Sequence, residues 1–278
     1  MLSDHSGRHA VKRMAIGIGE AHMHTMDIEE ALVFLTETFP FPGYFAPGLE
    51  SHTTVAREIR ARLAPGSRVL DLGCGPADKA AVLSCLGYHC TGFDDFNDPW
   101  HHEADNRTQI HAFAANVGVT LIERNGDTIP FENGAFDAVI VCDVIEHLHE
   151  SLRTILSEAL RTLRDGGHLL ITVPNAANIR KRFHLLVGKT NYPPYDDLFS
   201  CNGPWRGHVR EYVWDDLARL ARHLALQDVE IRGCHHMLGV LPSWARPAYK
   251  ALTAPLPGAR DSLMLVARKP DGWVAPQT

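Results

Sequence analysis

Short apolar runs alternate with amphipathic stretches along most of this 278-residue chain. Apolar runs bounded by turn residues are typical of buried strands, whereas apolar positions that repeat every three to four residues indicate helices with one buried face. The pattern predicts strands at residues 68–72, 89–93, 119–123, 135–142, 168–173, 227–232 and 262–267. It predicts amphipathic helices at residues 77–86, 152–163 and 213–224.

This alternation indicates an α/β protein with a central, mainly parallel sheet and helices on both faces. Three segments fall outside it. Residues 1–50, with a helix-like stretch at 27–38, are expected to form an N-terminal helical and loop cap on a domain that spans 51–278. Residues 175–210 and 234–260 are expected to be insertions in this domain, where specificity often resides. The alternative for all three is surface packing.

A Gly-x-Gly turn follows the first predicted strand, which contains Asp71. Glycines at 73 and 75 let the backbone turn sharply and approach a ligand. A dinucleotide site would need a third glycine where Asp78 stands, and no Gly-Lys-Ser/Thr follows as a phosphate loop requires. A pyrophosphate ligand is therefore disfavoured, and Asp71 suits a cationic, amino-acid-like group. Asp94, at the end of the next strand, is placed to bind ribose hydroxyls.

These residues resemble the first two motifs of the class I S-adenosylmethionine-dependent methyltransferases. Residues 69–75 read Val-Leu-Asp-Leu-Gly-Cys-Gly, and 92–94 read Gly-Phe-Asp. Three further blocks at 129–139, 143–148 and 163–175 match the family in the same order. The resemblance covers roughly residues 51–233 and implies a Rossmann-like sheet of seven strands, the last antiparallel, with lid insertions.

The resemblance implies a set of cofactor-binding residues. The glycine turn would surround the methionyl part and ribose, with Asp71 aligning the ammonium, and Asp94 would accept from both ribose hydroxyls. The family often has Asp-Ala where Asn125 and Gly126 stand, so these two are candidates for the adenine site. Asp127 competes with Asn125 or is a turn residue. The complete set is Asp71, Gly73, Cys74, Gly75, Asp94, Asn125, Gly126 and Asp127.

A cluster of carboxylates and imidazoles is the candidate for chemistry on the acceptor. Asp143, Glu146 and His147 follow the fourth strand, and a helix starting there would place all three on one face. With His208 they could hold Mg²⁺, Mn²⁺, Fe²⁺ or Zn²⁺. This set resembles metal-dependent methyltransferases of the terminal ribose of small RNAs and ubiquinone-pathway O-methyltransferases, with Asp143 in place of their first Glu.

Two plainer readings of the cluster stay open. Without a metal, His147 or His208 is the best catalytic base, because an imidazole can take a proton at neutral pH. Alternatively Asp143 caps a helix, Glu146 favours the positive end of that helix and His147 packs beneath a lid.

Composition limits the function. The chain is 45% apolar and 22% charged, as in globular proteins. Its net charge of −6 gives no basic field, which disfavours nucleic acid as a partner. No apolar run approaches the ~18 residues of a membrane span, and residues 1–19 lack the apolar stretch of a signal peptide. We therefore expect a cytoplasmic enzyme.

The favoured function is O-methylation of a hydroxylated small molecule or glycan with S-adenosyl-L-methionine. Alternatives are methylation of an RNA terminus, N- or C-methylation of a secondary metabolite, and a catalytically silent cofactor-binding scaffold. The apolar residues of 237–256 could touch a membrane, but a lid helix packed on the sheet is favoured over this peripheral contact.

Overall fold

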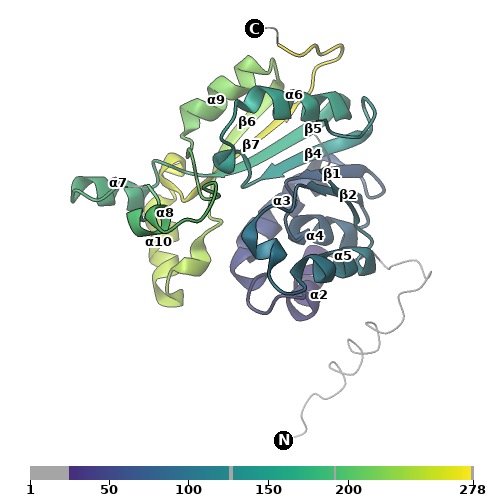
Figure 1. Cartoon of the computed structure of the whole chain (residues 1–278). Helices are drawn as coiled ribbons and strands as arrows, with labels where there is room; N and C mark the ends of the chain where they lie inside the picture. Colours follow the sequence, from purple (N-terminus) through teal and green to yellow (C-terminus); the bar gives the residue numbers. More distant parts are fainter. Residues whose placement is uncertain (1–24, 125–127, 191, 277–278) are drawn as a thin grey trace, which may run out of the picture.

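A computed structural model describes residues 25–124, 128–190 and 192–276 of the chain. Its centre is a seven-stranded sheet in the order β3-β2-β1-β4-β5-β7-β6 (Figure 1). The strands are β1 (Arg68–Leu72), β2 (His89–Asp94), β3 (Thr120–Glu123), β4 (Phe136–Cys142), β5 (Leu163–Pro174), β6 (Gln227–Cys234) and β7 (Ser262–Arg268). Each corresponds to one predicted strand.

The strand directions confirm the expected Rossmann-like sheet. Strands β1 to β5 pair with one another in parallel, and β7 lies antiparallel between β5 and β6. Ligands of open parallel sheets bind at the carboxyl ends of the strands, where the strand order reverses. Here that place is the shared edge of β1 and β4, since the chain moves from β1 outward to β3 and then returns to β4.

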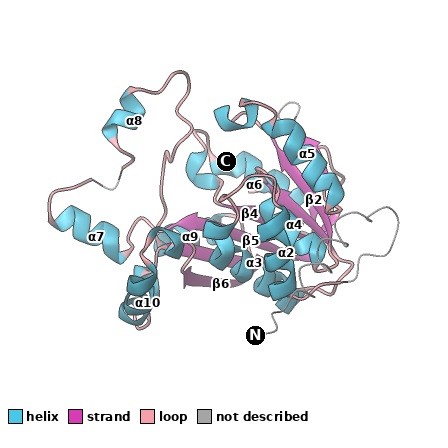
Figure 2. Cartoon of the chain, turned by 90° about the horizontal axis from the view of Figure 1, so that it is seen from below, coloured by secondary structure: helices cyan, strands magenta, loops and turns pink. Residues whose placement is uncertain are grey.

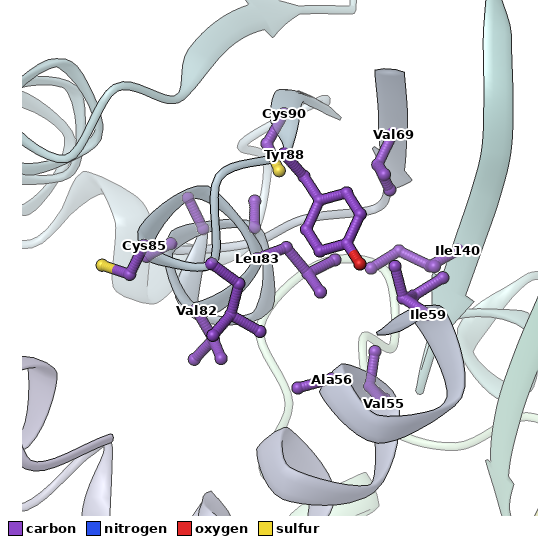
Figure 3. Packing of buried hydrophobic residues seen from close by; sticks show 14 of the residues in the cluster. Val55, Ala56, Ile59, Val69, Val82, Leu83, Cys85, Tyr88, Cys90 and Ile140 are labelled. Carbon is purple, nitrogen blue, oxygen red and sulfur yellow. The ribbon is translucent and has the colours of Figure 1, made fainter. Parts of the chain in front are cut away.

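Helices cover both faces of the sheet. The first layer consists of α2 (Ile28–Thr38), α3 (Leu49–Arg62), α4 (Asp78–Cys85) and α5 (Asn106–Asn116), and the second of α6 (Leu152–Thr162) and α9 (Trp214–His223). The sheet separates two apolar cores, because successive side chains of a strand point to opposite faces. Val69 packs in the first core, while its neighbour Leu70 packs in the second. Figure 3 shows Tyr88 of the first core surrounded by residues of α3 and α4.

The N-terminal segment joins this first core. Helix α2 begins with a capping box, in which Asp27 and Glu30 each accept a hydrogen bond from the other's backbone N–H. Leu35 and Phe45 are buried against α3 and α4. The boundary expected at residue 50 falls inside α3, which continues the packing of α2 into the sheet domain.

Three further helices project from the sheet. They are α7 (Ile179–Leu186), α8 (Tyr195–Phe199) and α10 (Arg246–Thr253). Figures 1 and 2 show α7 and α8 standing away from the sheet on long connections. They lie in the predicted 175–210 insertion, and α10 lies in the predicted 234–260 insertion. No helix in the described part of the chain has the length and apolar character to cross a membrane.

Candidate active site

The glycine turn of residues 73–75 connects β1 to α4 at the carboxyl edge of the sheet. Gly73 and Gly75 have φ of 76° and 49°, where side chains are strained. The Gly73 N–H donates to the Phe93 carbonyl at 2.7 Å. A Cβ on Gly73 would come within 2.5 Å of the Val144 side chain, whereas one on Gly75 would meet no atom within 4 Å. Gly73 therefore permits close packing, and Gly75 leaves an open approach to the turn.

Asp94 fixes this turn from the end of β2. Its Oδ2 accepts a 2.8 Å hydrogen bond from the Gly75 N–H, and its Oδ1 accepts one of 2.8 Å from the Phe96 N–H. Burial raises the pKa of Asp94, and the two backbone donors oppose that shift. A carboxylate oxygen has two lone pairs, so each oxygen of Asp94 can still accept a hydrogen bond from a ligand hydroxyl.

A cleft of about 470 Å³ opens in front of the turn. Its walls come from the carboxyl ends of β1, β2 and β4, together with a segment of the 175–210 insertion. The lining residues include Gly73, Phe93, Asp94, Asp95, Asp143, His147, His149, Trp205 and Arg206. A mostly apolar cavity with a few carboxylates suits a ligand that has both an apolar body and hydroxyl or cationic groups.

Asp71 lies beneath the cleft rather than in its wall. Its side chain is 2% exposed, and Oδ2 has no hydrogen-bond partner among the described residues. Burial raises the pKa of Asp71 to about 7. Lys79 is nearby, with Nζ 3.8 Å from Asp78 Oδ2 and 4.0 Å from Asp143 Oδ2. Burial opposes the charge of Lys79, but these carboxylates outweigh it and raise the lysine pKa. Among these groups, Asp143 is the carboxylate that lines the cleft.

The chain turns sharply after β4. Asp143 has φ of 56°, and residues Ile145–His147 form one short 3-10 helix. The expected helix face carrying Asp143, Glu146 and His147 is therefore wrong. The helix-capping reading of Asp143 is wrong as well, because no side chain caps this turn and the Asp143 carboxylate accepts from Thr172 Oγ1 at 3.3 Å.

A later segment, residues 205–212, lies along this turn; we call it the strap. The Glu146 carbonyl accepts from the N–H groups of Val209 and Arg210 at 2.7 and 3.2 Å. The Tyr212 hydroxyl donates to the Ile145 carbonyl at 3.2 Å. These contacts hold His208 beside the turn, although the two segments are far apart in sequence.

Two imidazoles are oriented by this packing. His147 Nδ1 lies 2.7 Å from the Arg206 carbonyl, and His208 Nδ1 lies 3.0 Å from Glu211 Oε1. Because both partners are acceptors, each Nδ1 carries the proton and each Nε2 keeps a lone pair. The rings meet edge to face with centroids 4.9 Å apart. Burial lowers the pKa of His147, which favours its neutral form.

Glu146 completes this arrangement. Its side chain is fully buried, and neither carboxylate oxygen has a hydrogen-bond partner among the described residues. Burial, followed by repulsion from Asp143, raises the pKa of Glu146 to about 8. One ligand atom each from Glu146, His147 and His208 all lie within 4.8 Å of one another. We call these three residues the Glu–His–His group.

The structure thus brings together three of the four residues predicted to hold a metal. The fourth, Asp143, is not a member of that group and faces the cleft and Lys79 instead. A buried carboxylate without donors needs a proton or a cation. Imidazoles whose second nitrogen is held by a carbonyl or carboxylate are typical of metal ligands. The donor set therefore fits a divalent ion, and the metal itself stays a prediction.

Other predicted residues take different positions. The Cys74 side chain packs below the turn with Phe96 and Ile110, so only its backbone is near the cleft. Asn125, Gly126 and Asp127, the adenine candidates, lie outside the described residues. Sequence reasoning missed Asp95, His149, Trp205 and Arg206 as cleft residues. Trp205 and Arg206 are close to His208 in sequence, but their contact with the β4 turn depends on tertiary packing.

Part of the chain resembles known methyltransferases in sequence. A family model described as a methyltransferase domain matches residues 70–171. The chain is 29% identical over 154 residues to an O-methyltransferase, rstn1, of Aspergillus nomiae, covering 52% of this chain and 66% of the relative. It is 26% identical over 172 residues to the ubiquinone biosynthesis O-methyltransferase of Vibrio cholerae, covering 62% and 65%. The chain thus spans just under two thirds of the length of these relatives.

Solved structures share the fold. A Thermotoga maritima S-adenosylmethionine-dependent methyltransferase, described as a possible histamine N-methyltransferase, is 14% identical with a TM-score of 0.55, covering 87% of this chain and 98% of that one. The Haemonchus contortus phosphoethanolamine N-methyltransferase 2, solved with S-adenosyl-L-methionine, is 17% identical with a TM-score of 0.54, covering 88% and 60%. These likenesses agree with the strand order and the motif blocks: residues 70–171 match a methyltransferase domain, and the fold is that of S-adenosylmethionine-dependent methyltransferases.

Proposed function

We propose that this protein transfers the methyl group of S-adenosyl-L-methionine to a hydroxyl of a small molecule or glycan. The observation that carries the proposal is that the Glu–His–His group adjoins the cleft formed by the glycine turn and Asp94, with His147 in the cleft wall. The printed names of the two curated relatives support oxygen as the acceptor atom.

The cleft residues fit this cofactor. Asp94 would accept from the two ribose hydroxyls while it holds the Gly75 amide. Asp143 and the buried Asp71 would attract the methionyl ammonium, although Lys79 already offsets part of their charge. Bound there, S-adenosylmethionine would supply an activated methyl carbon for in-line displacement. The protein then has to align the acceptor, exclude water and remove one proton.

The two histidines are suited to remove the proton of the acceptor hydroxyl. Each presents a free Nε2, because its Nδ1 is held by the Arg206 carbonyl or by Glu211. Lys181 pairs with Glu211 in turn, and together with His208 it lowers the pKa of Glu211 despite burial. An ionised Glu211 would stabilise the imidazolium of His208 after it accepts a proton.

Glu146, His147 and His208 would also hold a divalent ion. Such an ion would lower the pKa of an acceptor hydroxyl. Glu146 is the residue whose role depends most on it, because its buried carboxylate would lose its proton when a cation binds. Cytoplasmic residence and a small-molecule or glycan acceptor are part of this proposal.

Incubation with methyl-labelled S-adenosylmethionine tests the proposal. The full chain would be offered hydroxylated metabolites, glycans and RNA separately, each with Mg²⁺ or Mn²⁺. We expect label in a hydroxylated small molecule or glycan as a base-stable ether, and far less with the Asp94→Ala variant when the cofactor is kept below saturation. Label on nitrogen, label in RNA alone, or no transfer to any pool would contradict it.

A further inference from the structure

Helices α7 and α8 carry a concentration of exposed large apolar side chains; we call the two helices the apolar arm. Leu186 is 84% exposed, Phe199 77% and Tyr195 73%. Neither helix contains a buried residue. Scattered exposed apolar residues are ordinary, but several on one face of a helix mark an interaction surface.

The apolar residues of α7 share one face. Ile179, Phe183 and Leu186 follow at intervals of four and three, which places them on one stripe of the helix. Arg180 and Arg182 are exposed and flank that stripe on either side. A narrow apolar stripe bordered by arginines is the pattern of a helix that lies in the interface of a membrane.

Helix α8 repeats this division over a shorter length. Tyr195, Leu198 and Phe199 lie at i, i+3 and i+4, and the Tyr195 and Phe199 rings stack with centroids 6.0 Å apart. Asp196 and Asp197 occupy the other side of the helix. The acidic pair is thus directed away from the apolar face, while the basic residues border it on α7.

The charges distinguish a bilayer from a second copy of the chain. A symmetric pair of these stripes would bring Arg180 and Arg182 of both copies together, which is unfavourable. An anionic bilayer offers an apolar layer for Phe183 and Leu186 and negative headgroups for the two arginines. Lys181 does not take part, because it is paired with Glu211 in the strap.

The arm also borders the candidate active site. A hollow of about 490 Å³ is lined by Leu185 of α7 and Tyr192, which precedes α8, and by His208 of the strap. Leu185 is on a different face of α7 from the exposed stripe. One face of the arm therefore lines a hollow beside the Glu–His–His group, while another face is free to meet a partner.

We propose that the apolar arm binds the surface of an anionic phospholipid membrane and brings the hollow beside His208 to that surface. This is peripheral binding, in which the Phe183 and Leu186 side chains enter the headgroup region and Arg180 and Arg182 contact anionic lipids. One part of this proposal rests on the proposed methyl transfer, namely that a methyl acceptor reaches His208 from the membrane surface. Membrane binding by the arm does not.

Co-sedimentation with vesicles tests the proposal on the full chain. Vesicles of phosphatidylcholine with 30% phosphatidylglycerol should pellet the wild-type protein, and pure phosphatidylcholine vesicles should pellet much less. Phe183→Ser with Leu186→Ser should leave the protein in the supernatant. Arg180→Ser with Arg182→Ser should weaken binding by about fivefold for each charge removed. Val33→Ser, at an exposed apolar position of α2, should bind like wild type.

Light scattering on the same proteins tests whether a second copy of the chain, rather than a membrane, covers the apolar stripe of α7. Wild-type protein that stays in the supernatant with anionic vesicles would overturn the proposal. So would a wild-type dimer that the Phe183→Ser, Leu186→Ser variant converts to a monomer, because the stripe would then cover a second copy. S-adenosylmethionine titration of both variants separates this result from the proposed function, since the cofactor cleft should bind equally well whether or not the arm binds lipid.

Discussion

The glycine turn and the Glu–His–His group lie at neighbouring strand ends, but different forces hold them in place. The turn is fixed by consecutive backbone positions and by Asp94, the last residue of the adjacent strand β2. The Glu–His–His group is assembled by the strap, through contacts such as the one between His147 and the Arg206 carbonyl, 59 positions away.

The difference separates binding from chemistry. Among the described residues, Asp94 makes no hydrogen bond or ion pair with the strap, and His208 does not line the cleft, so each can be altered without disturbing the other. Variants of Asp94 should therefore change cofactor affinity, and variants of His208 should change turnover alone. The following predictions test that separation.

The largest effect is expected at Gly73. Gly73→Val places a Cβ within 2.5 Å of Val144 at a residue with positive φ, so the turn must move. S-adenosylmethionine affinity, measured by calorimetry, should fall by about two orders of magnitude or more. Gly66→Ala is the control, because Gly66 also has positive φ but its Cβ would meet no atom within 4 Å. Equal losses in both variants would show that strain alone, rather than this packing, matters.

The histidines should control turnover instead. His147→Ala and His208→Ala should each lower turnover by about 10²–10⁴-fold, and His208→Ala should leave cofactor affinity unchanged. If the group holds a metal, a chelator should abolish activity, and Mg²⁺, Mn²⁺, Fe²⁺ or Zn²⁺ should restore it. His223→Ala, at the exposed end of α9, should be inert. A chelator without effect and one dominant histidine would indicate a general base alone, and two fully active variants would remove the group from the mechanism.

The sequence predicted the cleft side well for a physical reason. The cofactor cleft is built from β1, the glycine turn that follows it, and Asp94 at the end of β2. These parts are close together in sequence, so local pattern and spacing define their arrangement. The strap and the positive φ of Asp143 depend on tertiary hydrogen bonds that no local pattern reveals. Helix α3 was missed similarly, because its few apolar residues gain their stability by packing on α4.

Asn175 should stabilise the connection between β5 and the two insertions. It is buried at the end of β5, where Nδ2 donates to the Gly258 and Arg260 carbonyls at 2.9 and 2.8 Å. Its Oδ1 accepts from the Ala177 N–H at 2.9 Å. Asn175→Ala leaves these groups without partners and should lower the free energy of unfolding by about 2–4 kcal/mol in urea denaturation. The exposed Asn97→Ala should change it little, and equal stability of both variants would contradict this role.

The Asp71→Asn substitution should have a smaller effect on stability, and that effect should depend on pH. Its pKa is raised to about 7 in the folded protein, so folded Asp71 keeps a proton that the unfolded chain loses above its ordinary value near 4. The wild-type protein should lose stability as pH rises from about 4 to 7, and no further from this group above that range. Asp71→Asn stays neutral, so its stability relative to wild type should be greater at pH 8 than at pH 5. An unchanged difference at the two pH values would contradict the shift.

Calorimetric titration of S-adenosylmethionine into wild type, Asp94→Ala and His208→Ala tests the central claim most directly. Loss of the ionised acceptor for two ribose hydroxyls should weaken binding to Asp94→Ala by ~2–4 kcal/mol, which is about 30- to 1,000-fold. His208→Ala should bind within about twofold of wild type, because His208 lies on the strap side and is not a cleft residue. Unchanged affinity in a folded Asp94→Ala variant, or no binding to the wild-type protein, would contradict the account.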